Sequence, residues 1–304
     1  MNQRTDAPRV LLLGSESGFC FHAFKALLDS RVAMAGVLIA SGSGEGVSRP
    51  VIRGSIPLSQ PGSVADLAAR EGIVTIRCEH TREAWARELA HEMAPDAVLV
   101  ACLPERLDEF WITLSPAGCF NLHPSLLPAY RGPAPLFWQL KDGVENTGIS
   151  VHRVEARMDA GPILMQEAHA IDSEDNLATL NAMLAAAGAR AFARALGDIV
   201  SGKARFIPQD EAKASAHPWP KDEDFALDAN WRARHAYRFV SATAGLGRPY
   251  SMETEGGALS IERVLDFDPK GTLERAFTTA GGVLTIRFAQ GTMRAVGKQV
   301  IGDS

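Results

Sequence analysis

The sequence is poor in cysteine, and this scarcity excludes two classes of protein. Four cysteines occur in 304 residues, at Cys20, Cys78, Cys102 and Cys119, without the paired spacing of a zinc site. No secretory hydrophobic segment precedes them. A disulfide-stapled secreted domain and a cysteine-based zinc module are therefore excluded, and we expect reduced thiols and a cytoplasmic location.

The chain also lacks an excess of positive charge and any long apolar run. Its net charge of -5 predicts no general attraction to nucleic acid or to an anionic membrane. No run reaches the roughly 20 apolar residues that span a bilayer. The eight histidines are far apart and have no paired ligand spacing, so we expect no metal site. DNA and membrane are therefore not among the expected partners.

What remains is the composition of an ordinary globular protein, with 46% hydrophobic and 22% charged residues. Short apolar runs alternate with segments of helical periodicity from residue 10 onward. This alternation predicts an α/β fold with a doubly wound, mostly parallel, Rossmann-like sheet, because fully apolar strands need helices on both faces. The expected strands are 10–13, 34–40, 73–76, 96–101, 118–122 and 148–154. The main expected helices are 63–69, 82–93, 135–141 and 176–200, with Asp172 and Ser173 as candidate caps of the last.

A change of composition separates a second domain. Residues 206–224 are polar and interrupted by proline, which predicts a linker. Beyond it we expect a helix at 231–242 and a small OB-like β-barrel, because short strands separated by glycines follow. These expected strands are 258–267, 271–277, 282–289 and 292–298. The predicted organisation is a large domain at 1–205, a linker at 206–224 and a small domain at 225–304.

Two polar residues stand at one expected strand end, in the segment "CFNLHPSLLPAYRGPAP". Asn121 and His123 share a face because strand side chains alternate. Open parallel sheets bind ligands at the carboxyl ends of their strands. Asp159 follows the strand expected at 148–154, and a neighbouring parallel strand would bring it to the same edge.

These three residue types suit acyl transfer to an amine. An Asn amide can donate to the oxyanion of a tetrahedral intermediate, His can act as acid or base, and a carboxylate favours the imidazolium. No Ser or Cys nucleophile is needed. The alternative is structural: Asn121 caps a loop, His123 is a buried histidine with satisfied hydrogen bonds, and Asp159 is a turn residue.

The segments "FNLHPSLLPAYRGPAP" and "TGISVHRVEARMDAGPIL" resemble the folate-dependent formyltransferases, which act on glycinamide ribonucleotide, methionyl-tRNA or amino sugars. The resemblance implies formyl transfer from 10-formyltetrahydrofolate, as co-substrate, to a primary amine. It implies a catalytic set of Asn121, His123 and Asp159, in which Asp159 orients His123 and helps to relay the amine proton.

The resemblance also implies binding positions. Folate contacts are implied beside the strand that precedes the signature, at Ala101, Leu103 and Leu107, and in the turn before Asp159, at Glu155 and Met158. Acceptor contacts are implied in the proline-rich loop, at Ser125, Leu126 and Arg131. For Leu103 and Leu107 the alternative is core packing, and for Arg131 it is a solvated loop charge.

Members of this family differ in the amine that they formylate. Chain length and "PKDEDFALDANW" resemble methionyl-tRNA formyltransferases, but their basic loop near the start is reduced here to Arg49 and Arg53 within 41–62. Residues 221–304 hold eleven basic and eleven acidic residues, which gives no net attraction for phosphates. We therefore favour a small-molecule amine, such as an amino sugar or modified amino acid, with initiator methionyl-tRNA second. A basic patch would reverse this order, and its candidate members are Arg232, Arg234, Arg238 and Arg248.

Three other functions stay open. A formyltetrahydrofolate hydrolase would use the same three residues with water as the acceptor. A dinucleotide-binding enzyme would use the early glycine loop "GSESGF", although this loop lacks the third glycine at the required offset. A catalytically idle protein could bind folate or a nucleotide sugar for regulation.

Overall fold

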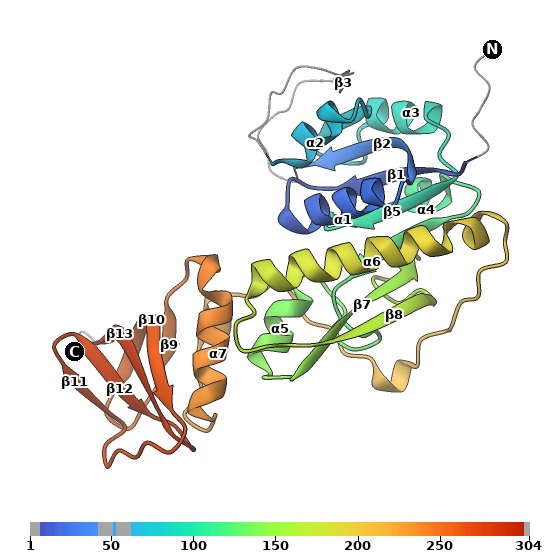
Figure 1. Ribbon diagram of the computed structural model, residues 1–304. Coiled ribbons are helices and arrows are strands. Elements are labelled where there is room, and N and C mark those ends of the chain that lie inside the picture. Colours follow the sequence, from blue (N-terminus) through green and yellow to red (C-terminus); the bar gives the residue numbers. More distant parts are fainter. Residues whose placement is uncertain (1–6, 42–50, 53–61, 301–304) are drawn as a thin grey trace. The chain divides into compact units, whose positions relative to one another are not determined.

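The computed structural model describes residues 7–41, 51–52 and 62–300 (Figure 1). Most of the loop expected at 41–62, including Arg49 and Arg53, lies outside the described residues. The chain forms two compact units, each drawn from several stretches. Unit 1 comprises Met1–Pro135, Asn146–His169 and Leu180–His217, and unit 2 comprises Leu136–Glu145, Ala170–Thr179 and Pro218–Ser304. The domain boundaries expected around 206–224 stay a prediction.

Unit 1 is built on an eight-stranded sheet with the order β3-β4-β2-β1-β5-β6-β7-β8. The strands are β1 (Arg9–Gly14), β2 (Ala33–Ala40), β3 (Val51–Ile52), β4 (Thr75–Cys78), β5 (Ala97–Ala101), β6 (Cys119–His123), β7 (Asn146–Arg153) and β8 (Ile163–Ala170). Strands β4, β2, β1, β5 and β6 pair in parallel, whereas β3 and β7 join antiparallel. The predicted mostly parallel sheet is confirmed.

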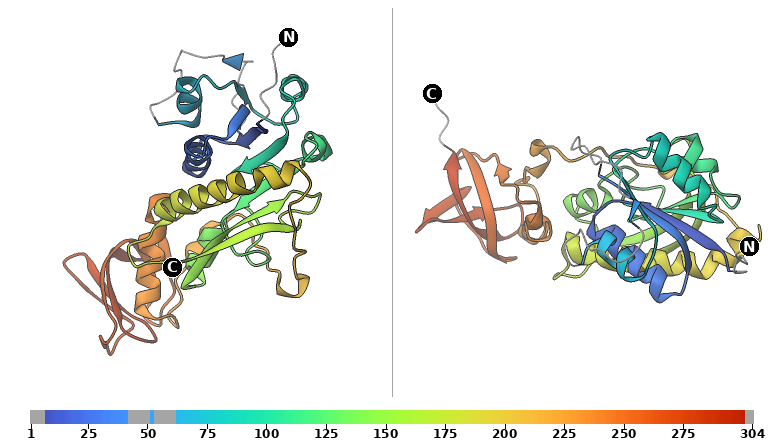
Figure 2. Two further views of the ribbon diagram at one scale, coloured as in Figure 1. Left: turned by 45° about the vertical axis from the view of Figure 1, so that its right-hand side comes forward. Right: turned by 90° about the horizontal axis from the view of Figure 1, so that it is seen from above.

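Helices flank this sheet (Figure 2). They are α1 (Gly18–Asp29), α2 (Val64–Arg70), α3 (Ala84–Glu92), α4 (Glu109–Thr113) and α6 (Leu177–Val200). On one face, Trp111 of α4 and Ala86 of α3 pack in a buried cluster with Val98 of β5 and Cys119 of β6. Residues of β6 that face the other way meet α6, because the Phe120 and Phe192 ring centroids lie 5.6 Å apart. The predicted doubly wound architecture is confirmed.

Helix α6 approaches the sheet closely at one glycine. A Cβ atom on Gly188 would lie 2.7 Å from a side-chain carbon of Ile149, so only glycine lets the helix come this near. The caps predicted for this helix are wrong. Asn176 accepts hydrogen bonds from the N–H groups of Ala178 and Thr179 at 2.9 and 3.1 Å, because it directly precedes the first turn.

Unit 2 contains α5 (Pro135–Lys141) apart from its first residue, α7 (Ala233–Thr243) and a five-stranded antiparallel sheet. The sheet order is β11-β12-β13-β10-β9. The strands are β9 (Tyr250–Met252), β10 (Ala258–Asp268), β11 (Phe277–Ala280), β12 (Val283–Arg287) and β13 (Thr292–Val300). Phe137 of α5 packs against Phe225 and against Phe239 of α7, with ring centroids 5.1 and 5.5 Å apart. The predicted small all-β region is confirmed.

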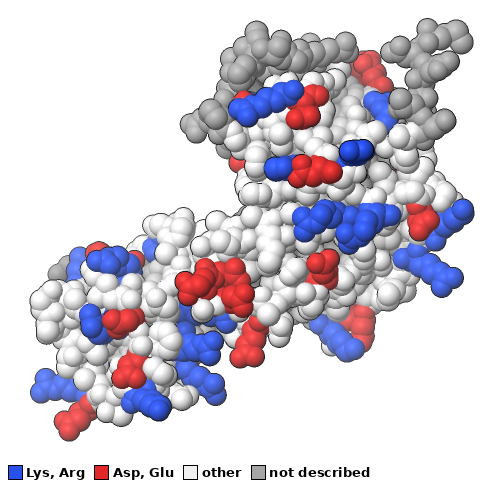
Figure 3. Space-filling view, viewed as in Figure 1, with Lys and Arg blue, Asp and Glu red and all other residues white. Residues whose placement is uncertain are grey.

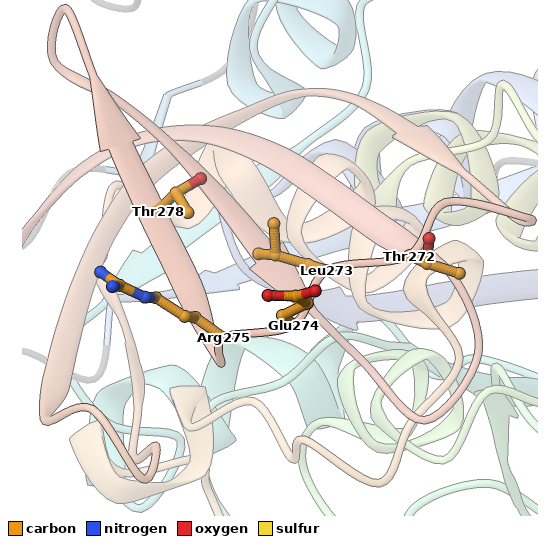
Figure 4. A pocket seen from close by; sticks show the side chains of 5 residues that line it. All are labelled: Thr272, Leu273, Glu274, Arg275 and Thr278. Atoms are coloured by element: carbon orange, nitrogen blue, oxygen red, sulfur yellow. The ribbon is translucent and has the colours of Figure 1, made fainter.

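The strand expected at 271–277 is wrong, because β11 begins only at Phe277. The carbonyls of Leu273 and Glu274 accept hydrogen bonds from the Arg287 guanidinium rather than from a neighbouring strand. The loop and the start of β11 border an open pocket of about 510 Å³ (Figure 4). It is lined by Thr272, Leu273, Glu274, Arg275 and Thr278.

Within the described ranges, no helix combines the length and apolar character needed to cross a bilayer. All four cysteines are free thiols, of which Cys102 alone is exposed.

Candidate active site

Strand β6 delivers Asn121 and His123 to one place. Strand alternation sends Phe120 and Leu122 toward α6, and it sends Asn121 and His123 to the opposite face. The Cys119 side chain lies on that same face and packs in the buried cluster around Trp111. The two polar side chains therefore lie just beyond an apolar core, at the carboxyl end of the strand.

Asp159 reaches this site by a different route from the one predicted. Strand β7 pairs antiparallel with β6, so that Asn121 lies opposite His152 and His123 lies opposite Ser150. The prediction that a parallel neighbouring strand brings Asp159 to this edge is therefore wrong. The loop that joins β7 to β8 is closed where Arg153 N–H donates to the Pro162 carbonyl at 3.0 Å, and Asp159 lies within this loop.

The three predicted catalytic residues converge. Nδ1 of His123 lies 3.7 Å from Oδ2 of Asp159. The Asn121 amide nitrogen lies 3.4 Å from Oδ1 of Asp159. Oδ2 of Asp159 also accepts from the N–H of Gly132 at 2.9 Å. One carboxylate therefore links the asparagine, the histidine and the proline-rich loop.

His152 is a fourth member that the sequence analysis missed. Its Nδ1 lies 2.9 Å from the carbonyl oxygen of Arg153, which can only accept, so Nδ1 carries the hydrogen of the neutral ring. Nε2 is then free to accept from the Asn121 amide at 3.2 Å. The sequence carried little signal, because β7 reads NTGISVHR and His152 is one of several polar residues in it; only the structure shows that 2% of its surface is exposed.

Burial and charge set the protonation states of His123 and Asp159. Burial lowers the pKa of His123 below its ordinary value, although Asp159 and the Tyr130 carbonyl oppose this. Burial alone would raise the pKa of Asp159, but His123, His152 and the Gly132 N–H outweigh it and hold the pKa well below its usual range. At neutral pH the site therefore contains a carboxylate beside a neutral imidazole.

The neutral His123 ring has a defined tautomer. Nε2 lies 2.8 Å from the carbonyl oxygen of Tyr130, so Nε2 carries the hydrogen and Nδ1 holds the lone pair. Nδ1 is the atom nearest to Asp159. A proton taken up at Nδ1 would lie beside the carboxylate and would be stabilised by it.

The residues predicted to bind the acceptor have partners within the fold. The Ser125 hydroxyl is fully buried and donates to the Ala129 carbonyl at 2.7 Å. Arg131 is only 7% exposed, and its guanidinium binds Gln209 and Glu211. Leu126 is half-buried. Their contacts with an acceptor stay a prediction.

The residues predicted to bind folate divide into two groups. Ala101 is buried at the end of β5, and Leu103 and Leu107 pack against the core cluster of Trp111. Glu155 and Met158 are exposed in the loop that carries Asp159. Their folate contacts stay a prediction. Within residues 7–41, 51–52 and 62–300, no group of three or more His, Cys, Asp or Glu side chains could hold a metal ion.

Comparison with known proteins decides the family. Residues 9–196 match the family described as "Formyl transferase". The chain belongs to this family. The predicted folate-dependent formyltransferase is thereby confirmed as the class of enzyme.

Relatives of this formyltransferase include methionyl-tRNA formyltransferases and sugar N-formyltransferases. A methionyl-tRNA formyltransferase from Roseiflexus castenholzii is 31% identical over 234 residues, covering 77% of this chain and 72% of that protein. The crystal structure of WlaRD, a sugar 3N-formyl transferase with dTDP and 5-N-formyl-THF, aligns at a TM-score of 0.64 with 12% identity, over 98% of this chain and 100% of the other. An N-formyltransferase from Helicobacter canadensis, in complex with folinic acid and dTDP-3-aminofucose, aligns at 0.64 with 13% identity, over 95% and 99%. The structural likenesses show a shared fold.

Proposed function

We propose that this formyltransferase moves the formyl group of 10-formyltetrahydrofolate to a primary amine, with Asn121, His123 and Asp159 around the reacting carbon. The observation that supports the proposal is the separation of 3.7 Å between His123 Nδ1 and Asp159 Oδ2, with the Asn121 amide 3.4 Å from the same carboxylate. A hydrogen-bond donor, a neutral base and an ionised carboxylate then meet at one strand end.

The bonds and protons of this reaction balance without any further group. The amine nitrogen bonds to the formyl carbon, and the bond between this carbon and the donor nitrogen breaks. The Asn121 amide would donate to the oxygen that becomes negative in the tetrahedral intermediate. His123 Nδ1 would take the proton that the amine loses, beside Asp159, and this proton would pass to the departing donor nitrogen.

For the acceptor we favour a small-molecule amine, such as an amino sugar. Two members of the candidate basic patch have partners within the fold: Arg238 donates to the Ile171 carbonyl, and Arg248 pairs with Asp222. Basic and acidic side chains are interspersed on the face shown in Figure 3. Because tRNA binding relies on unpaired cations, these pairings weaken the case for a nucleic-acid acceptor.

Initiator methionyl-tRNA is the second candidate, and a specific observation favours it. The sequence relative with 31% identity is a methionyl-tRNA formyltransferase. Arg232 and Arg234 are exposed at the start of α7 and could contact phosphates.

The test is a direct comparison of acceptors. The purified protein is given 10-formyltetrahydrofolate with dTDP-linked 3-amino sugars, with free amino acids or with initiator methionyl-tRNA. We expect turnover with a small amine, at a rate that does not change with salt concentration. Efficient formylation of methionyl-tRNA that weakens steeply with salt, and weakens further in Arg232→Ala/Arg234→Ala, would reverse the order. Formate release at the same rate without any amine would instead indicate a hydrolase.

A further inference from the structure

Residues 207–217, here called the strap, contact both loops that frame the candidate site. Ile207 and Ile163 exchange two backbone hydrogen bonds of 2.8 Å at the start of β8. Arg131 forms a parallel bridge with Ala216 near the other end of the strap. Residues 207–217 belong to unit 1.

Gln209 in the strap uses the whole hydrogen-bonding capacity of its side chain. Its amide nitrogen donates to the carbonyls of Asp159 and Gly161 at 2.8 and 2.7 Å. Its oxygen accepts from Nε and Nη2 of Arg131 at 3.2 and 2.7 Å. Because Arg131 can only donate, the orientation of the amide group is defined.

The backbone of Asp159 needs this support. Its φ is 51°, in the left-handed region that most residues with a side chain avoid, although Asp enters it more readily than most. Such a conformation persists when the surrounding structure holds it. The two hydrogen bonds from Gln209 bind the carbonyl of Asp159 itself and that of Gly161, two residues later.

Arg131 connects this support to the histidine side of the site. Its guanidinium also pairs with Glu211 at 2.8 Å, so its head group is fixed on the strap. Its neighbours in the chain face the catalytic pair directly: the Tyr130 carbonyl lies 2.8 Å from His123 Nε2, and the Gly132 N–H donates to Asp159.

Ser215 holds the same loop from the strap. Its hydroxyl accepts from the N–H of Tyr130 at 2.8 Å, and its carbonyl accepts from the N–H of Arg131 at 2.9 Å. Tyr130, whose carbonyl faces the imidazole, and Arg131, which binds Gln209, are thus both tied to the strap.

We propose that Gln209 is a positioning residue for formyl transfer: its amide group holds the backbone of Asp159 so that the carboxylate stays opposite His123. The inference rests on the proposed function, because it concerns the proposed roles of Asp159 and His123. Gln209 acts through these residues.

Two variants separate the contacts of Gln209. Gln209→Met keeps the length of the side chain and removes all four hydrogen bonds. Gln209→Glu keeps an acceptor for Arg131 but loses both donors to the loop. Lys213→Ala is the control, because this strap side chain is 77% exposed. We expect kcat to fall about 10- to 100-fold in both Gln209 variants, on the scale of misplacing a reacting group, and to stay at the parent value in the control.

The second readout is the titration of the His123 ring by NMR, which needs no turnover. The charged or titratable groups that act on this ring are Asp159, His152 and Arg131. If Asp159 moves away, its favourable effect on the imidazolium weakens, and His123 should titrate at lower pH in both Gln209 variants than in the parent.

Three results would overturn the proposal. Parent kcat in folded Gln209→Met would show that the contacts are dispensable. A loss in Gln209→Met with full activity in Gln209→Glu would show that the Arg131 contact alone matters. A lower melting temperature of the Gln209 variants, with an unchanged titration of His123, would show that Gln209 has a merely structural role. An active Asp159→Ala variant would instead refute the proposed function, while the ring titration would still test the geometry.

Discussion

Nδ1 of His123 and Oδ2 of Asp159 lie 3.7 Å apart, although one belongs to β6 and the other to the loop after β7. At this distance the carboxylate stabilises a proton on the imidazole without forming a short hydrogen bond to it. The Asn121 amide contacts the same carboxylate, so a change at any of the three should affect the others.

Replacement of Asp159 by Ala should lower kcat by about 100-fold or more, on the scale of losing an electrostatic contribution to the transition state. The variant should keep its circular dichroism spectrum, because Asp159 lies in a loop. Asp29→Ala removes an exposed carboxylate of α1 and should leave kcat unchanged. Near-full activity of Asp159→Ala would rule out its proposed role.

Replacement of Asn121 by Ala should also lower kcat by about 100-fold, because the donor for the developing oxyanion is lost. Asn121→Asp removes the amide donor while keeping the shape of the side chain, and it should be at least as impaired. Steady-state kinetics with saturating donor and amine would measure both. If Asn121→Asp retained the parent kcat, the amide would not be the oxyanion donor.

The rate should depend on a neutral His123. Its pKa is lowered by burial, so the acid limb of kcat/KM should have its midpoint below the ordinary histidine value of 6.5. Asp159 opposes that lowering, so the residual activity of Asp159→Asn should show a midpoint at still lower pH. Rates measured across the range from about pH 5 to about pH 8 would show both shifts. A midpoint above 6.5 in the parent would contradict the assignment.

Asp159 should make stability depend on pH. Its pKa is lower in the folded protein than the ordinary value of 3.8, so its ionised form stabilises the fold above that value. This contribution should be lost as the pH falls below 3.8 toward the folded-state pKa. The difference in unfolding free energy between the parent and Asp159→Asn, measured in urea, should therefore be constant above about pH 5 and should narrow progressively as the pH falls below 3.8. A difference that does not narrow would show that ionisation of Asp159 does not stabilise the fold.

Gly132 should tolerate no side chain. Its φ is 114°, and a Cβ atom would lie 2.1 Å from the His217 carbonyl oxygen, so Gly132→Ala must displace the strap or the loop. We expect a loss of about 2 kcal/mol or more in the free energy of unfolding, together with reduced kcat, because the N–H of Gly132 binds Asp159. Gly197→Ala on α6 is the matched control. No atom lies within 4 Å of its Cβ position, and helix propensity predicts stabilisation of up to about 1 kcal/mol. Equal unfolding free energies for the two variants would contradict this account.

Much of the fold was predictable because its signals are local. Helix α5 occupies the predicted residues, and α6 begins one residue later than expected. Apolar runs in β1, β2 and β5 are buried on both faces, which is why they predicted a parallel sheet. Strand β8 was missed because its central residues are exposed and polar, as an edge strand allows.

The sequence by itself determined the apolar periods, the residue types at the site and the family signature that carries Asn121 and His123. Only the tertiary structure decided that β7 runs antiparallel, that His152 joins the site, and that Arg131 and Gln209 bind each other. The physical reason is the range of each cause. Side-chain alternation acts over neighbouring residues, whereas strand direction and a contact between residues 131 and 209 depend on distant segments that pack together only in the folded chain.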